Sequence, residues 1–246
     1  MAALTDKVAL VTGGSRGIGA GIARRLAAKG ADVAVTYMTN KEQVLETVAA
    51  VGAAGRRGVA IAADNADPDA VAEAVQRTVA ELGRLDVLVN NAGTTVLGPI
   101  DTLTVEDSDR IYAVNVRAVV AATQAAVAHL GDGGRIITIG SCLAPRVASP
   151  GWSLYAMSKA ALLGFTKGVA RDVGPRGITA NVVQPGPIDT DMNPADGEFA
   201  DAERALLAVD HFGHVDDVAA TVAHLAGPAG RFITGAAIDV DGGWAA

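Results

Sequence analysis

The stretch that most constrains the fold is residues 7–26, KVALVTGGSRGIGAGIARRL. It begins with the apolar residues of a buried strand, passes through a glycine-rich turn, and continues with Ile22, Ala23 and Leu26 at the spacing of one helix face. A strand, a glycine turn and a helix N-terminus favour a bound phosphate, because main-chain N–H groups and the helix dipole face it. The glycines form T-G-x-x-x-G-x-G rather than G-x-G-x-x-G, and a turn that needs positive φ is the alternative interpretation.

Strand-like and helix-like segments alternate along the rest of the chain. This alternation predicts an α/β fold: a single-domain, Rossmann-type, doubly wound sheet of about seven parallel strands with helices on both faces, spanning residues 1–246. Ligands of such sheets lie beyond the carboxyl ends of the strands. The expected strands cover residues 8–11, 32–37, 58–63, 85–90, 135–139, 178–183 and 236–240, and the expected later helices cover residues 41–51, 68–82, 105–130, 153–173 and 215–225.

Composition excludes several classes of protein. The net charge of −7, without any tract rich in lysine and arginine, argues against a nucleic-acid partner. One cysteine, Cys142, rules out an internal disulfide and suits a reducing compartment. The first seven residues are too polar for a signal peptide, and no apolar run is long enough to cross a bilayer. We therefore expect a cytoplasmic protein that does not interact with membranes.

A second informative stretch is Tyr155-Ala-Met-Ser-Lys159. A tyrosine and a lysine four residues apart share one helix face. A phenol ordinarily titrates near a pKa of about 10, and a neighbouring ammonium group lowers that pKa. The pair could therefore work as a general acid and base. The alternative is an amphipathic helix with the tyrosine packed inside and the lysine in solvent.

These motifs occur in a fixed order with several others. Asn-Asn-Ala-Gly follows the fourth expected strand, Asn115 lies in the long helix, Ser141 follows the fifth strand, and Pro185-Gly186 follows the sixth. In this combination the sequence resembles the short-chain dehydrogenase/reductase family over nearly its whole length. It is most similar to bacterial ketoreductases of the 3-oxoacyl carrier-protein reductase type, including the closing stretch ITGAAIDVDGG.

The resemblance implies hydride transfer between a nicotinamide cofactor and a ketone or secondary alcohol. It assigns proton transfer to Tyr155, depression of the tyrosine pKa and contact with the nicotinamide ribose to Lys159, and binding of the substrate carbonyl to Ser141. Asn115 would kink its helix and hold a water in a proton relay; a buried polar group without a catalytic role is the alternative for it.

We expect the cofactor to be NADP(H). An NAD site needs a carboxylate after the second strand, where this chain has Tyr37, and Arg16 and Lys41 offer positive charge to a phosphate. Solvated surface charges are the alternative for those two cations, and a helix cap is the alternative for Asp64. The full set of expected cofactor-binding residues is Gly13, Ser15, Arg16, Gly17, Ile18, Gly19, Tyr37, Thr39, Asn40, Lys41, Asp64, Asn65, Asn91, Ala92, Gly93, Tyr155, Lys159, Pro185, Gly186, Ile188 and Thr190.

The segment 189–212 is expected to form a substrate loop with an apolar lid, opposite a wall in residues 145–154. The lid candidates are Met192, Phe199, Leu206 and Leu207, and the wall candidates are Val147 and Trp152. Such a pocket suggests a hydrophobic ketone, but leaves acyl thioesters and cyclic or aryl ketones open.

The resemblance also predicts a homotetramer that buries residues 153–173. We expect no metal site, because the four histidines are scattered, and we interpret Cys142 as a small buried side chain. The alternative function is a nucleotide-binding protein that senses or sequesters its ligand without turnover.

Overall fold

The computed structural model describes residues 3–246 of the chain. These residues contain one seven-stranded parallel sheet in the order β3-β2-β1-β4-β5-β6-β7, which confirms the predicted fold class. The strands are β1 (Val8–Val11), β2 (Asp32–Tyr37), β3 (Gly58–Ala62), β4 (Leu85–Asn90), β5 (Leu130–Ile139), β6 (Thr179–Pro185) and β7 (Ala237–Val240).

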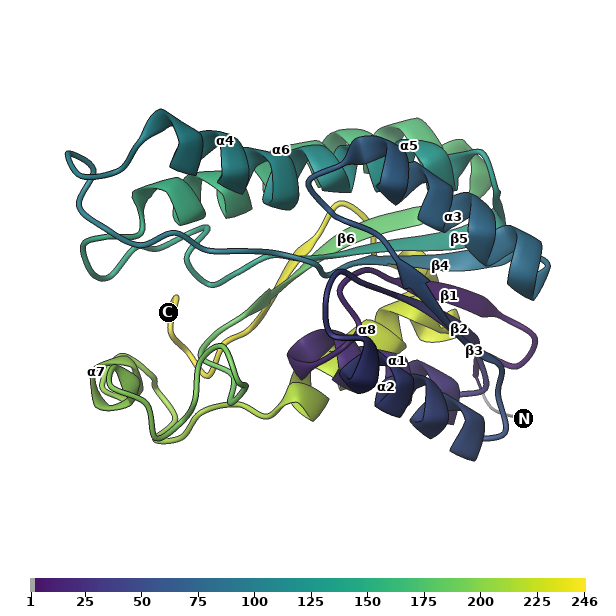
Figure 1. Cartoon of the computed structure of the whole chain (residues 1–246), viewed down its shortest axis with the longest axis horizontal. Helices are drawn as coiled ribbons and strands as arrows, with labels where there is room; N and C mark the ends of the chain where they lie inside the picture. The colour runs from purple at the N-terminus through teal and green to yellow at the C-terminus, as the bar shows by residue number, and fades with distance from the viewer. Residues whose placement is uncertain (1–2) are drawn as a thin grey trace.

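Helices cover both faces of the sheet (Figure 1). The α-helices are α1 (Gly17–Ala28), α2 (Lys41–Ala53), α3 (Pro68–Leu82), α4 (Val105–Tyr112), α5 (Ala118–Val127), α6 (Ser153–Val173), α7 (Ala200–Arg204) and α8 (Val215–Ala226). A π-helical turn, η1 (Ala113–Arg117), joins α4 to α5, and two 3-10 helices, η2 (Gly174–Arg176) and η3 (Pro228–Phe232), follow α6 and α8.

Two apolar cores hold these layers together. One core packs α1, α2 and α8 on the sheet through side chains such as Ile22, Val44 and Val222. The other packs α3, α5 and α6 on the opposite face through side chains such as Val75 and Ala122. The inner strands β1, β2, β4 and β6 are buried on both sides, as parallel strands between helices should be, whereas the edge strands β3 and β7 are partly exposed.

The sequence placed several elements at their observed bounds, namely β2, α3, β4 and α6. The expected long helix over residues 105–130 is wrong in two respects. It starts as predicted, with Thr104 and Asp107 in a reciprocal capping box, but it changes to π geometry around Asn115 and ends at Val127. Leu130 instead opens β5, where it pairs with Leu85.

The reversal of strand order between β1 and β4 determines where the candidate site lies. The chain leaves β1 toward β2 on one side, and later returns to β4 on the other. Loops that leave the carboxyl ends of these two strands separate there, and a ligand can lie between them. Among residues 3–246, no helix combines the length and the apolar character needed to cross a membrane.

Candidate active site

The glycine turn after β1 has a backbone that a ligand can approach closely. Gly13 and Gly17 have φ of +64° and +53°, which favours glycine over other residues. The N–H groups of Gly13 and Gly14 donate to the Thr36 hydroxyl and carbonyl, at 2.9 Å each. Helix α1 then begins at Gly17, and the side chain of its N-cap residue, Arg16, does not cap it. The turn therefore leaves the first N–H groups of α1 for an outside anion.

The segment after β4 is attached directly to this turn. The Thr12 hydroxyl accepts from the N–H groups of Asn91 and Ala92, at 3.0 and 3.1 Å. The Asn91 amide donates to the carbonyls of Thr12 and Gly13, at 2.9 and 3.0 Å. Gly93 follows, and a side chain there would point within 3.6 Å of the Lys159 ammonium nitrogen. The missing side chain keeps space in front of that nitrogen, and these residues fit a bound dinucleotide.

The residues expected around the adenosine phosphate gather at the end of β2. Tyr37 closes β2, and Thr39, Asn40 and Lys41 are exposed as the chain enters α2. The hydrogen bonds from the glycine turn to Thr36 bring Arg16 to the same edge of the sheet. The side chain of Arg16 is 45% exposed and lies 3.6 Å from Asp191 of the substrate loop.

Asp64 and Asn65 lie after β3 in the loop before α3. The Asp64 carboxylate accepts from the Ala66 N–H at 2.8 Å, while Asp67 caps α3 by accepting from the Asp69 N–H at 2.9 Å. The helix cap considered for Asp64 is thus provided by Asp67. Arg117 from η1 donates to the Ala66 carbonyl at 2.9 Å and fastens this loop.

The expected catalytic residues meet at the carboxyl end of β5. Ser141 follows β5, and its hydroxyl accepts from the Leu143 N–H at 3.1 Å. Helix α6 brings Tyr155 and Lys159 to the same place, because the Lys159 ammonium donates to the Ile139 carbonyl at 2.9 Å. That ammonium nitrogen lies 5.7 Å from the centre of the Tyr155 ring. Lys159 and Ser141 are buried, with 4% and 7% exposure.

The ionisation of this group differs from the sequence expectation. Desolvation raises the pKa of Tyr155 to about 12, although a hydrogen bond with Ser141 opposes the rise. Desolvation also lowers the pKa of Lys159 to about 8. The net shift of the tyrosine pKa is therefore upward, opposite to the depression that the resemblance assigned to Lys159. The physical reason is that burial penalises the charged forms of both side chains.

Asn115 lies at the centre of the π-helical turn and is 1% exposed. Its amide oxygen accepts from the Thr94 N–H at 2.8 Å, and its amide nitrogen donates to the Thr94 carbonyl at 2.9 Å. The same nitrogen donates to the Ser158 hydroxyl at 3.0 Å, and Ser158 donates to the Tyr155 carbonyl at 2.7 Å. Asn115 thus joins the loop after β4 to the helix that carries Tyr155. Single π turns of this kind are often found at functional sites.

The segment after β6 lies beside the Ser141 segment. The Cys142 N–H donates to the Pro185 carbonyl at 2.9 Å. Gly186 follows, and a side chain there would meet the backbone of Asp241 at 2.6 Å. Ile188 is buried and pairs with Gly213, whereas Thr190 reaches toward Gly17 of the glycine turn. Cys142 is buried as expected, and desolvation raises the pKa of its thiol to about 12.

The substrate loop has two parts. Met192 and Phe199 are exposed, with Phe199 next to the short helix α7, which the sequence did not predict. Leu206 and Leu207 instead pack inward, in a cluster with Tyr155 and Trp152. In the expected wall, Trp152 joins this cluster, while Val147 is half exposed. The members of the cluster are Cys142, Leu143, Trp152, Tyr155, Leu206, Leu207 and Trp244.

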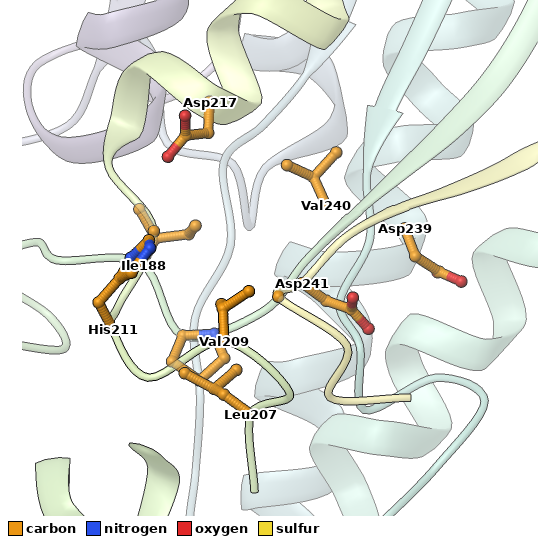
Figure 2. Close-up of a pocket in the computed structure, with 11 residues that line it drawn as sticks. Ile188, Leu207, Val209, His211, Asp217, Asp239, Val240 and Asp241 are labelled. Carbon is orange, nitrogen blue, oxygen red and sulfur yellow. The ribbon is translucent and has the colours of Figure 1, made fainter. Parts of the chain in front are cut away.

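A pocket of ≈ 340 Å³ opens behind this loop (Figure 2). Leu207, Val209 and His211 come from the loop, and Val240 and Asp241 come from the end of β7. Ser141 and Tyr155 are not among the described residues that line it. The pocket thus lies between the substrate loop and the end of β7, and it shares Leu207 with the cluster that contains Tyr155.

Two contributors to the site were missed by sequence reasoning. Trp244 is buried next to the segment of Ser141, and Arg146 donates a hydrogen bond to the Trp244 carbonyl. Trp244 stands just beyond the last expected strand, near the end of the chain. A single apolar residue there does not usually indicate a helix, a strand or a packed segment. The pairing of two glycines with a tryptophan, Gly242-Gly243-Trp244, could have suggested a packed tail.

A parallel sheet with a glycine-rich turn at its reversal point is the arrangement of the Rossmann-type dinucleotide-binding fold. A family model described as Enoyl-(Acyl carrier protein) reductase matches residues 13–245. The chain belongs to the short-chain dehydrogenase/reductase family, in the branch of the acyl-carrier-protein reductases.

Solved structures agree with this assignment. A short chain dehydrogenase from Burkholderia cenocepacia J2315, crystallised in complex with NADP, is 59% identical, with a TM-score of 0.98. The match covers 99% of this chain and 100% of that one. The neighbour's NADP is the cofactor type expected from the residues after β2.

Two curated relatives differ in what their names describe. The "Cyclic-di-GMP-binding biofilm dispersal mediator protein" of Escherichia coli (strain K12) is 45% identical over 246 residues, covering 100% of both chains. The "Hydroxynaphthalene reductase-like protein Arp2" of Metarhizium brunneum is 39% identical over 254 residues, covering 98% of this chain and 95% of the relative. One name describes a nucleotide binder and the other a reductase.

Proposed function

We propose that this chain is an NADPH-dependent carbonyl reductase, which converts a hydrophobic ketone to a secondary alcohol. The observation that carries the proposal is the meeting of Ser141, Tyr155 and Lys159 at the end of β5, beside the glycine turn. The solved neighbour in complex with NADP supports the choice of cofactor. A mere binder of nucleotides does not need all three of these side chains.

NADPH, when bound, supplies the hydride that reduces the carbonyl carbon. The glycine turn would hold its pyrophosphate, Arg16 and Lys41 its adenosine phosphate, and the segments Asn91–Gly93 and Pro185–Thr190 its nicotinamide half. Lys159 would hold the nicotinamide ribose, and Asp64 and Asn65 would lie beside the adenine.

The protein's own residues then handle the charge on the substrate oxygen. The Ser141 hydroxyl donates a hydrogen bond to that oxygen, which becomes more basic as the carbonyl is reduced. The Tyr155 hydroxyl gives its proton to the same oxygen and becomes a phenolate. The raised pKa of Tyr155 keeps the hydroxyl protonated at neutral pH, so the residue is ready to act as an acid, in the direction of reduction. The Lys159 ammonium nearby stabilises the phenolate that results.

Two further properties belong to the proposal. We expect a homotetramer, because α4 and α6 expose the apolar side chains Val105, Tyr112 and Met157, all at least half exposed. The outward positions of α6 also include Gly164 and Gly168, where an added side-chain carbon would meet no atom within 4 Å. Light scattering of the purified protein tests the mass. We also expect a cytoplasmic location.

The experiment that tests the function follows NADPH absorbance with a panel of linear, cyclic and aryl ketones. Steady oxidation with at least one class supports the reductase. Tight NADPH binding without oxidation across the panel contradicts it.

A second candidate is a nucleotide-binding protein without turnover. The relative from Escherichia coli, named for binding a cyclic dinucleotide, favours this alternative. Titration with cyclic di-GMP in the presence and absence of NADPH tests it. Saturable binding by a protein that oxidises no NADPH would favour this second function.

A further inference from the structure

The two tryptophans of the chain lie in one cluster beside the proposed proton donor. Trp152 precedes α6, and its ring meets Tyr155 edge to face, with centroids 5.8 Å apart and an angle of 64° between the planes. Trp244 comes from the C-terminal tail, residues 241–246, and is 5% exposed. Aromatic residues make up 4% of the chain, so both indoles at one place concentrate its flat apolar surface there.

The tail that carries Trp244 is fixed in position. The carboxylate of Asp241 accepts from the N–H groups of Gly243 and Ala245, at 2.9 Å each. Arg146, from the loop between Ser141 and α6, donates to the Trp244 carbonyl. Figure 1 shows the C-terminal end beyond β7, on the same side of the molecule as α7 and the loop before α6. The tail is therefore attached to the Ser141 segment.

The same tail holds the substrate loop. The N–H groups of Ala208 and Val209 both donate to the Gly242 carbonyl, at 2.9 and 3.1 Å. Gly243 has φ of +83°, and a side chain there would come within 2.5 Å of the Ala208 side chain. This close contact places Leu206 and Leu207 against the cluster of Trp244. The inner part of the substrate loop is thus fastened to the tail.

One polar atom in this cluster is left over. The indole nitrogen of Trp244 is buried, and it has no hydrogen-bond partner among the described residues. A buried donor without a partner is costly in a folded protein, and such groups call for an explanation. An acceptor on a bound molecule would pair with it when Leu206 and Leu207 of the substrate loop, which pack in the same cluster, move aside.

From these contacts we propose that Trp244 binds the ketone substrate and selects for ketones that carry an aromatic ring. The ring of the substrate packs against Trp152 and Trp244, and the Trp244 N–H donates to an oxygen on that ring. A linear acyl chain gains less from such flat surfaces. This inference rests on the proposed reductase function and narrows its substrate to aryl ketones.

The kinetic test compares acetophenone, para-methoxyacetophenone and ethyl acetoacetate as substrates with saturating NADPH. For Trp244→Ala we expect KM to rise about tenfold for the two aryl ketones, with less than about a threefold change for the linear ester. Trp244→Phe keeps the ring and loses the N–H, so its KM rises more for the methoxy compound than for acetophenone. Phe232→Ala, at an exposed ring away from the site, is the control and leaves all three values unchanged.

Binding gives a second readout that needs no turnover. In the Trp152→Phe protein, fluorescence comes from Trp244, and we expect saturable quenching by para-methoxyacetophenone. NADPH affinity, measured on every variant, separates a local effect from misfolding. The inference is overturned when Trp244→Ala and Trp244→Phe shift KM equally for aryl and linear ketones, or when the quenching does not saturate. A wild-type protein that reduces no ketone overturns the proposed function instead, and the quenching experiment still decides whether Trp244 binds a ring.

Discussion

The ammonium nitrogen of Lys159 lies 2.9 Å from the carbonyl oxygen of Ile139, so helix α6 is fastened to the last residue of β5. Ser141 stands just beyond that residue. One buried hydrogen bond therefore joins the helix directly to the strand end that precedes Ser141, across the long loop between them. The bond also explains why Lys159 remains buried, with 4% exposure, at a site that lowers its pKa.

The pKa of Lys159, about 8, predicts how the reduction depends on pH. Below that value the side chain carries the charge that stabilises the phenolate formed on Tyr155, and above it the charge is lost. We expect kcat/KM for ketone reduction to fall as the pH rises through about 8. Lys159→Met should be slow throughout and lack this decline. A rate that rises through the same range contradicts the assignment.

Arg16 is predicted to decide between NADPH and NADH. Its loss removes a charge-assisted hydrogen bond to a phosphate, so Arg16→Ala should raise the KM for NADPH about tenfold, with little change for NADH. Arg24→Ala, an exposed arginine on the same helix, is the matched control. The Asp191 carboxylate lies 3.6 Å from the Arg16 guanidinium and competes with the phosphate for it. Asp191→Ala should therefore lower the Kd for NADPH by no more than about fivefold. Equal effects of Arg16→Ala on both cofactors would refute the prediction.

Asn115 is predicted to combine a stability role with a positioning role. Asn115→Ala leaves groups of Thr94 and Ser158 unpaired, and should lower the free energy of unfolding by about 2 kcal/mol. Asn181→Ala is the control, because that buried amide bonds the backbone at Ile233 and Ala236, away from the catalytic group. Urea unfolding measures both. We expect kcat per folded molecule to fall for the Asn115 variant and to hold for the Asn181 variant; a fall in both would make Asn115 merely structural.

The ionisation of Asp86 is predicted to make the stability of the fold depend on pH in the acid range. Burial alone would raise its pKa, but hydrogen bonds from Arg84, Lys7 and the Val8 N–H hold it below the ordinary value of 3.8. A carboxyl with a lowered pKa stabilises the fold above 3.8, and this stability is lost as the pH falls through the folded-state pKa.

The corresponding variant is Asp86→Asn, which should lose about 1.5–3 kcal/mol at neutral pH and show a shallower loss on acidification. Asp201→Asn, at a fully exposed carboxylate, is the matched control and should leave the Tm unchanged. Thermal unfolding over a pH series measures both variants. A parallel pH dependence in Asp86→Asn and wild type would exclude the carboxyl as the cause.

How much the sequence could predict depends on how local each feature is. The strand Leu85–Asn90 and the helices Pro68–Leu82 and Ser153–Val173 follow from runs of apolar residues and from Pro68, so their bounds were predicted correctly. The glycine turn and its neighbours could be predicted because a phosphate site needs glycine and a helix N-terminus at one place.

The remaining features depend on packing between distant segments. The π turn at Asn115 inserts one residue into a helix and leaves the apolar pattern almost unchanged, so the pattern could not reveal it. The raised pKa of Tyr155 comes from desolvation, and its side chain packs in a cluster with Leu206 and Trp244, which lie far away in the sequence. The role of the tail likewise depends on contacts between Gly243 and Ala208, which composition cannot show.

The most direct test of the account is the rate of ketone reduction by Tyr155→Phe with saturating NADPH. The variant keeps the ring that packs against Trp152 and removes the hydroxyl that gives the proton. We predict a fall in kcat of about a hundredfold to ten-thousandfold, with an unchanged Kd for NADPH. A variant that binds NADPH normally and reduces the ketone as fast as the parent protein would contradict the account.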